Sequence, residues 1–320
     1  MTLQASVVIC TYNRPAMLAA AVRSCLRDAT RRGALFEVVI ADNSRDGHAA
    51  PLVAALLAEG HPVRAVPASP PNISIARNAG LRAARAPLVA FLDDDLEVEP
   101  GWLDHFLDTM AATGADVAIG PVRPYFPGGA PAWDPHGTRF TRVLDQPTGA
   151  TIPVQAGAGS GFVVSTASSI WRATTCFTDP APFDPGFGAS GGEDLDLFLR
   201  LAARGRRVVW CAEAGVRETI PASRTAGRYQ VLRAYSGAQV YTAAAVRHSA
   251  APRRQAAGIM ARGAVQAGLG AAALPVAALL GVGGAGTART MRALSLLASG
   301  CGKLTWWRKV PLYHLEKAQP

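Results

Sequence analysis

Three consecutive aspartates, Asp93, Asp94 and Asp95, directly follow a hydrophobic run in the sequence FLDDDLEVEP, residues 91–100. Carboxylates this close raise one another's pKa and repel, so a compensating group is expected beside them. Two interpretations are open. One is a solvated acidic turn that binds nothing, and the other is a site for a divalent cation held by carboxylate oxygens.

A second acidic pair, Glu193 and Asp194, lies near the start of the segment GGEDLDLFLRLAARG, residues 191–205. The hydrophobic spacing of this segment predicts a helix, and the helix dipole favours carboxylates in the first turn. Gly191 and Gly192 would allow the preceding loop to move. The pair can be ordinary first-turn acids, or it can supply a general base to a bound substrate.

Alternating strands and helices over the first 120 residues must position these acids. Hydrophobic runs at 6–10, 36–42, 62–66, 87–93 and 117–122 predict strands, and residues 15–32, 51–59, 75–85 and 101–113 have helical spacing. Strands that are hydrophobic on both faces predict a mainly parallel, doubly wound α/β sheet with helices on both faces. Ligands of such sheets bind beyond the carboxyl ends of the strands, where the polar segments TYNR, DNSRDG and DDD fall.

The chain changes character towards its C-terminus. Residues 123–153 are irregular and rich in Pro, Gly and Trp, and a strand is predicted at 206–210. After about Glu218 acidic residues nearly vanish. We therefore expect a first domain at 1–218 and a helical, basic C-terminal region at 219–320.

The composition excludes several classes of protein. The chain has 320 residues, of which 49% are hydrophobic, and its five cysteines are scattered without CxxC spacing. A globular protein in a reducing compartment is expected, with neither a disulfide framework nor a zinc site. The N-terminus has no cationic segment before its first hydrophobic run, so no signal peptide is expected.

Positive charge is concentrated in the C-terminal region. Residues 219–320 carry 13 of the 32 Lys and Arg residues but one of the 23 acidic residues, Glu316. No zinc finger, helix-turn-helix signature or aromatic RNA-binding motif accompanies this charge, so no nucleic-acid partner is expected. Two interpretations stay open: a solvated arginine-rich face, and attraction to an anionic membrane surface at about 1 kcal/mol per basic residue.

Residues 263–288 contain no charged side chain. The run exceeds the ~20 residues that span a bilayer, but it is mostly Ala and Gly, and the central Pro275 favours two short helices over one. A membrane span, a buried soluble hairpin and a hairpin lying in the membrane interface are the alternatives. We favour the interfacial hairpin, because Trp306 and Trp307 suit the headgroup layer and basic residues flank the run. The flanking basic residues are Arg253, Arg254, Arg262, Arg289, Arg292, Lys303, Arg308 and Lys309.

Five ordered motifs carry a family resemblance. They are VVICTYNRP (7–15), VVIADNSRDG (38–47), NISIARNAGL (72–81), VAFLDDDLEVEPGWL (89–103) and GGEDLDLFLRLAARG (191–205). In this order they resemble the family-two glycosyltransferases, over about residues 5–218. The resemblance implies the GT-A fold, a nucleotide-diphosphate sugar donor with UDP favoured, and transfer with inversion at the anomeric carbon.

The continuation VRETIPASR…YQVLRAYSGAQ is similar to the bacterial exopolysaccharide and cell-envelope branch, where a basic, membrane-associated tail is usual. The expected acceptor is thus a lipid-linked or oligosaccharide glycan. The expected location is the cytoplasmic face of the inner membrane, with the protein peripheral or monotopic.

The resemblance also assigns roles to residues. It makes Asp194 the general base for the acceptor hydroxyl, with Glu193 contacting acceptor or donor sugar. Of the two outer aspartates, it makes Asp95 the direct ligand of Mn²⁺ or Mg²⁺, and it places Asp93 towards the ribose or a metal-bound water. Asp42 would bind the base, commonly uracil, and Asn78 and Gly80 would shape a turn around Arg77. The residues assigned to the nucleotide sugar are Thr11, Tyr12, Asn13, Arg14, Asp42, Arg77, Asp93 and Asp94.

Two positions depart from the family pattern. Many relatives complete the metal site with a histidine where this chain has Glu218, so either Glu218 substitutes or the metal is held more loosely. Relatives also often carry Asn in the segment that reads GAGSGF here, which puts Gly159–Gly161 in doubt as a contact to the donor sugar.

Two alternatives to a glycosyltransferase exist. A nucleotidyltransferase would carry a glycine-rich phosphate loop after its first strand, and CTYNRP contains no glycine. A non-catalytic nucleotide-sugar or glycan-binding module of the same fold is the alternative from a different class. Such a module would be expected to lose one of the acidic groups, and both are present.

Overall fold

The computed structural model describes residues 3–28, 33, 35–154, 164–279 and 284–310, so Gly159–Gly161 lie outside the described residues. The chain divides into two compact units. The first comprises Met1–Tyr125, Thr141–Gly188 and Glu193–Thr219, and the second comprises Phe126–Phe140, Ala189–Gly192 and Ile220–Pro320.

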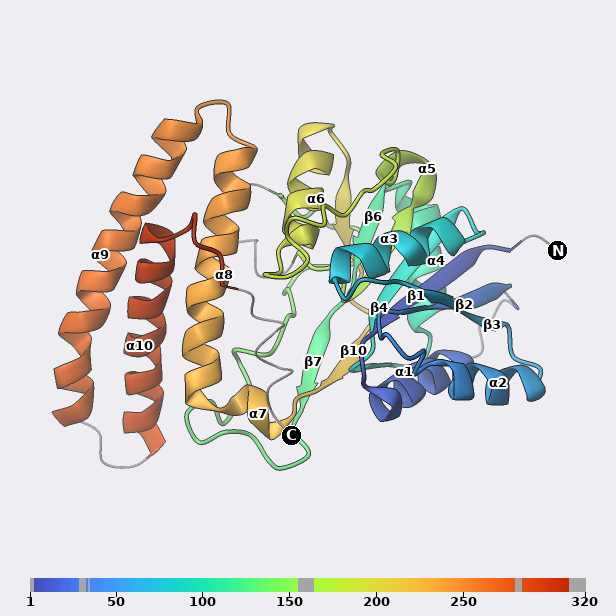
Figure 1. The fold of residues 1–320 in the computed structure, drawn as a ribbon, viewed down its shortest axis with the longest axis horizontal. Coiled ribbons are helices and arrows are strands. Elements are labelled where there is room, and N and C mark those ends of the chain that lie inside the picture. The colour runs from blue at the N-terminus through green and yellow to red at the C-terminus, as the bar shows by residue number, and fades with distance from the viewer. Residues whose placement is uncertain (1–2, 29–32, 34, 155–163, 280–283, 311–320) are drawn as a thin grey trace. The chain divides into compact units, whose positions relative to one another are not determined.

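A seven-stranded sheet of order β3-β2-β1-β4-β8-β6-β9 is the centre of the first unit (Figure 1). Its strands are β1 (Ala5–Thr11), β2 (Phe36–Asp42), β3 (Val63–Pro67), β4 (Leu88–Asp93), β6 (Val117–Ile119), β8 (Ser168–Arg172) and β9 (Val208–Trp210). Strands β3, β2, β1 and β4 pair in parallel, as do β6 and β9, whereas β8 runs antiparallel between β4 and β6. The expected mainly parallel α/β sheet is therefore confirmed.

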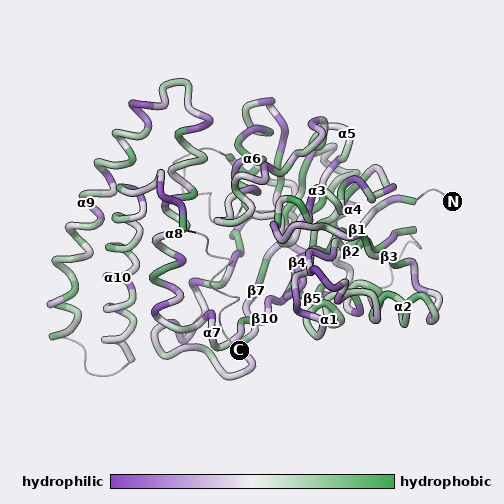
Figure 2. Tube along the Cα trace, in the orientation of Figure 1, coloured by the Kyte–Doolittle hydropathy of each residue, from purple (hydrophilic) through white to green (hydrophobic). Residues whose placement is uncertain are grey.

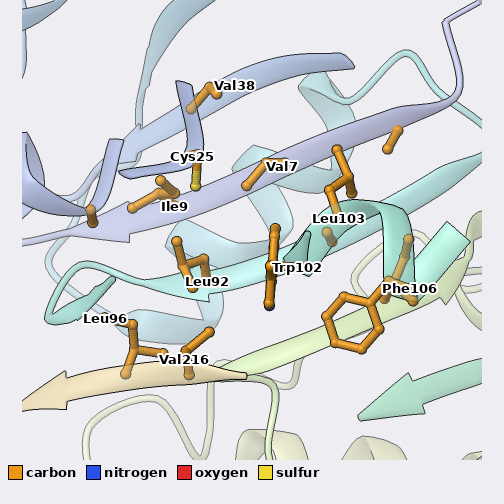
Figure 3. Packing of buried hydrophobic residues seen from close by; sticks show 14 of the residues in the cluster. Val7, Ile9, Cys25, Val38, Leu92, Leu96, Trp102, Leu103, Phe106 and Val216 are labelled. Atoms are coloured by element: carbon orange, nitrogen blue, oxygen red, sulfur yellow. The ribbon is translucent and has the colours of Figure 1, made fainter. Parts of the chain in front are cut away.

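Helices cover both faces of this sheet because alternate strand residues point to opposite sides. On one face, Val7, Ile9 and Leu92 pack in a core with Trp102 and Phe106, whose ring centroids lie 5.3 Å apart (Figure 3). The helices that share this core are α1 (Pro15–Arg27), α2 (Ala50–Ala58) and α4 (Trp102–Thr113). The opposite core is shared by α3 (Ile73–Ala83), α5 (Ala173–Cys176) and α6 (Glu193–Ala203).

The single strand expected at 117–122 is wrong. The chain forms β6 and then β7 (Val122–Tyr125), which belongs to a separate three-stranded sheet with β5 (Leu96–Val98) and β10 (Val216–Thr219). Pro121 has no N–H for a ladder. At Gly120 a Cβ would lie 2.1 Å from the Ala214 carbonyl oxygen, so the two chains approach closely where the strands separate.

The expected turn around Arg77 is also wrong, because Asn78 and Gly80 lie inside α3. Asn72 caps this helix by accepting from the N–H groups of Ser74 and Ile75. A Cβ on Gly80 would lie 2.3 Å from Val8 Cγ1, so glycine lets α3 pack directly on β1. The helix therefore presents Arg77 from a fixed backbone.

The second unit is helical. It contains α7 (Ala222–Thr225), α8 (Gly227–Arg247), α9 (Pro252–Leu279) and α10 (Gly284–Leu304). Pro275 lies inside α9, so the expectation of two short helices separated there is wrong. A proline within a helix removes the hydrogen bond to the carbonyl four residues earlier. That residue, Ala271, is exposed, and water can replace the missing N–H.

Glycines let the helices of the second unit pack through their backbones. A Cβ on Gly300 in α10 would lie 2.5 Å from Ala267 N and 2.6 Å from Gly263 O in α9, and one on Gly302 would lie 2.2 Å from Tyr235 O in α8. Close packing of this kind leaves no room for a side chain.

We expect Gly300→Val to lower the free energy of unfolding by about 1–3 kcal/mol, because the valine overpacks the contact between α9 and α10. Gly268→Val is the matched control, since nothing lies within 4 Å of its Cβ position and valine is a better helix former than glycine. Thermal and denaturant unfolding of the two variants measure the difference. Equal stability would show that the helices do not pack this closely.

Candidate active site

The three aspartates lie where β4 ends, and side chains from two neighbouring elements meet them. Asp93 is the last residue of β4, and Asp94 and Asp95 form the turn into β5. Thr11 Oγ1, at the end of β1, donates to Asp94 at 2.8 Å. Arg14 Nη1 lies 3.1 Å from Asp94 and 3.5 Å from Asp95. The TYNR and DDD motifs therefore form one site, as parallel strand ends predict.

Arg77 joins the aspartates to the second acidic pair. Its guanidinium is buried, ion-pairs with Glu193 Oε1, and lies 3.6 Å from Asp93 Oδ1. The Phe183 ring packs 5.5 Å from the guanidinium carbon, which adds a cation–π contact. Burial alone would lower the pKa of Arg77, but the neighbouring acids, Glu193 first, raise it, so the side chain stays charged.

A third arginine, Arg142, adds positive charge to the site. It comes from the irregular stretch at 123–153, which contains none of the five motifs. Its Nη2 donates to Glu218 Oε2 at 2.8 Å, and both side chains are largely buried. Its positive charge is one of the influences that lower the pKa of Asp93. Arg14, Arg77 and Arg142 together compensate much of the charge that the aspartates bring.

The compensation is incomplete, because burial disfavours the charged form of each carboxyl group. Burial raises the pKa of Asp94 to about 6 against the opposing effect of Arg14. Burial also raises the pKa of Glu193 to about 7, opposed by Arg77 and assisted by Asp194. The pKa of Asp93 is raised by burial as well, against Arg77 and Arg142. The site is therefore prepared for additional positive charge.

The second acidic pair begins α6 after two glycines in the left-handed region, Gly191 at φ +83° and Gly192 at φ +95°. Glu193 is buried, and its Oε2 has no hydrogen-bond partner among the described residues. Asp194 is half-buried, and its Oδ1 accepts from the Leu195 N–H at 2.7 Å. The two neighbours thus differ: Glu193 is fixed by Arg77, and Asp194 is the more accessible.

The loop after β2 is organised by Asp42. Its Oδ1 accepts from Ser44 N and Ser44 Oγ, and its Oδ2 accepts from Ala49 N at 2.8 Å. Asn13, which adopts φ +54°, contacts His48 Nδ1 through its Oδ1 at 2.8 Å. This contact ties the loop after β1, which includes the half-buried Tyr12, to the loop after β2.

The oxygen ligands present suit Mg²⁺ or Mn²⁺ only in part. Asp93 and Asp95 offer carboxylate oxygens, but no group of three or more His, Cys, Asp or Glu side chains among the described residues could hold a metal ion. Magnesium is commonly bound by one or two protein carboxylates together with substrate phosphates and water. The two aspartates fit that mode, in which the metal arrives with the diphosphate.

Sequence reasoning missed two residues of this site, His48 and Arg142. In the structure His48 contacts Asn13. In the sequence it directly follows the DNSRDG motif, and this position beside a polar loop is a signal that could have identified it. Arg142 stands 76 positions before its partner Glu218 in an irregular stretch without a motif. Nothing in its sequence neighbourhood distinguishes it from the other arginines.

Comparisons with known proteins show the family of the chain. The model of the family described as Glycosyl transferase family 2 matches residues 6–171. The succinoglycan biosynthesis protein ExoM of Rhizobium meliloti (strain 1021) is 32% identical over 241 residues, which cover 75% of this chain and 74% of ExoM.

Two solved structures share the fold. The S. aureus TarS fragment 1–349 in complex with UDP-GlcNAc has a TM-score of 0.52 and 14% identity, covering 92% of this chain and 90% of the fragment. GalNAc-T7 with UDP, GalNAc and Mn²⁺ has a TM-score of 0.51 and 17% identity, covering 68% of this chain and 44% of that chain. At these identities the likeness concerns the GT-A fold alone.

Proposed function

The chain belongs to glycosyltransferase family 2, and from that premise we propose that it moves a sugar from a nucleotide-diphosphate donor, with UDP favoured, to a hydroxyl of a lipid-linked glycan. The name of ExoM and the similarity to it support a place in exopolysaccharide biosynthesis. The TarS complex and GalNAc-T7 support UDP as the nucleotide.

One observation carries the proposal. At the carboxyl ends of the parallel strands, Arg14 contacts Asp94 and Asp95, and the buried Arg77 contacts both Asp93 and Glu193, the first residue of α6. Anionic and cationic groups concentrated at one edge suit a substrate that carries both a diphosphate and hydroxyl groups. Carboxyl groups whose pKa is raised by burial beside a charged partner, as for Asp94 and Glu193, are typical of functional sites.

The residues have distinct proposed tasks. Asp194 accepts the proton of the acceptor hydroxyl, and the oxygen of that hydroxyl forms the bond to the anomeric carbon. The bond from that carbon to the diphosphate breaks on the opposite side, and the configuration inverts. Glu193 orients a sugar hydroxyl, and Asp42 with the Thr11–Arg14 loop binds base and ribose. A metal ion held by Asp93 and Asp95 would neutralise charge on the departing diphosphate.

Turnover of a UDP-sugar panel with Mn²⁺ tests the function. We expect the purified chain to hydrolyse at least one donor slowly and to transfer its sugar when bacterial lipid-linked glycans are added. Donor binding without any hydrolysis or transfer would instead indicate a non-catalytic nucleotide-sugar-binding module. Extending the panel to other nucleotide bases tests the preference for UDP.

The second unit has features of a membrane-associating hairpin. Within the described residues, one helix is long and apolar enough to cross a membrane by length and composition, over Pro252–Ala277 of α9, and most of this stretch is exposed. Figure 2 shows hydrophilic residues near the start of α9 and few along the rest of that helix. Four large hydrophobic residues are exposed on it: Val265, Leu269, Val276 and Leu279.

We infer that this surface lies in the interface of an anionic membrane. Exposed arginines accompany it, at Arg253, Arg254 and Arg262 on α9 and at Arg289 and Arg292 on α10. Apolar side chains and basic residues on one hairpin are the combination that binds anionic lipid surfaces. The proposed location is therefore the cytoplasmic face of the inner membrane, where a lipid-linked acceptor would be at hand.

We expect the protein to sediment with vesicles that contain phosphatidylglycerol, and high salt to weaken this binding without abolishing it, because the apolar contribution is not screened. The variant Val265→Ser with Leu269→Ser should lose the salt-resistant fraction, since both side chains are exposed and do not support the fold. Protein that stays in the supernatant at low salt would contradict the interfacial model. Resistance to alkaline carbonate extraction would replace it by a membrane span.

A further inference from the structure

Arg142 is held in place at both its backbone and its side chain. Its N–H donates to Val122 O and its carbonyl accepts from Val122 N, each at 2.9 Å, so the residue forms an isolated antiparallel bridge with β7. Glu218, which bonds its guanidinium at 2.8 Å, is a residue of β10, between β5 and β7. A surface loop arginine would not be fixed in this way.

Burying the guanidinium of Arg142 costs free energy, which suggests that its charge serves a function. Its side chain is 17% exposed, its Nε lies buried, and that N–H has no hydrogen-bond partner among the described residues. A buried ion pair often stabilises a fold no better than packed hydrophobic residues would. An unmet buried donor adds a further penalty.

Arg142 lies next to the turn that holds the aspartates. Its partner Glu218 pairs with Leu96, the residue after Asp95, in the ladder between β10 and β5. The next residue of β10, Thr219, donates its N–H to the Asp95 carbonyl oxygen at 2.9 Å. Among the described residues near this turn, Arg14 pairs with the aspartates and Arg77 pairs with Glu193, whereas Arg142 pairs with neither group of acids.

We propose that Arg142 binds the diphosphate of the nucleotide-sugar donor, and that Glu218 serves to position its guanidinium. Guanidinium groups match phosphate oxygens with paired donors. A permanent cation at this point would share the neutralisation of the diphosphate with a metal ion. The proposal rests on the proposed function, because it names a further donor-binding residue of the same site.

The test compares affinities for UDP and for uridine, which lacks phosphates, by calorimetry on the full chain. In EDTA, Arg142→Gln should weaken UDP binding by about 10- to 100-fold, as expected for a lost hydrogen bond between charged groups, and leave uridine binding unchanged. Arg142→Lys should recover part of the loss, since it retains the charge. Arg123→Gln is the matched control, because Arg123 is a residue of β7 that forms an exposed ion pair with Glu99.

Glu218→Gln separates positioning from metal binding. A positioning role predicts the same loss of UDP affinity with Mn²⁺ and in EDTA, whereas a metal ligand would lose only the Mn²⁺-dependent part and would overturn the role given to Glu218. Unchanged UDP affinity in folded Arg142→Gln, or equal loss of UDP and uridine binding, would overturn the proposal for Arg142. Wild-type protein that binds neither UDP nor uridine even with Mn²⁺ present would contradict the proposed function instead.

Discussion

Replacing Asp194 with Asn is expected to slow sugar transfer by about 10²- to 10⁴-fold, the usual contribution of a general base. The acceptor hydroxyl has a pKa far above neutrality, so its attack depends on a group that takes the proton. Asn has the size of Asp and still accepts the Leu195 N–H bond that Asp194 Oδ1 makes. Donor affinity should therefore stay near that of the wild type, and the loss should appear in kcat.

Asp196→Asn is the matched control, since it removes a carboxylate from the same turn. Asp196 is fully buried and pairs with Arg200 at 3.1 Å, on the other side of the helix start. We expect this control to lower the melting temperature and to keep turnover. Wild-type turnover in Asp194→Asn would remove Asp194 from the mechanism and leave Glu193 as the remaining acid of the pair.

The second large effect is expected at the aspartate triplet. Asp93→Ala and Asp95→Ala should each abolish the Mn²⁺-dependent part of UDP-sugar affinity, because these two carboxylates are the proposed protein ligands of a metal bound with the diphosphate. The fold should survive, since Arg14 keeps Asp94 and Arg77 keeps Glu193 as partners. Relief of repulsion can even raise the melting temperature of the free protein.

Titrations of UDP-sugar with Mn²⁺ and with EDTA measure this effect. Glu97→Gln serves as control and should keep the metal dependence. It changes a partly exposed carboxylate of β5 that pairs with Arg27 and Arg217. If both alanine variants bind the donor as the wild type does under the two conditions, the triplet is an acidic turn that holds no metal.

The sequence predicts the fold most reliably where one local pattern determines the result. β2 occupies Phe36–Asp42, the predicted range, because its residues are hydrophobic throughout and end in a polar loop. β8 was missed because it is short, reads SSIWR, and is placed by β4 and β6, its neighbours in the sheet. The prediction of two short helices around Pro275 is wrong because a helix can tolerate a proline where water reaches the carbonyl that has lost its N–H partner.

The candidate site divides in the same way. Thr11, Arg14 and Asp94 could be expected together, since strand ends bring their motifs to one edge. The direct pairing of Arg77 with Glu193 could not be read from the sequence, because it depends on how α3 and α6 approach each other on one face of the sheet. Arg142 is harder still, since its place is set by one backbone bridge to Val122.

The long sequence separations in this network have a consequence for synthesis of the protein on the ribosome. Arg77 meets Glu193 across 116 positions, and Arg142 meets Glu218 across 76. While the chain is being made, β1 to β4 can pair early, but Arg77 and the aspartate triplet wait for α6 and β10 to emerge. The nascent chain therefore carries its acidic cluster only partly neutralised until about Thr219 has left the exit tunnel, and the edge of the sheet that holds the aspartates cannot be completed before then.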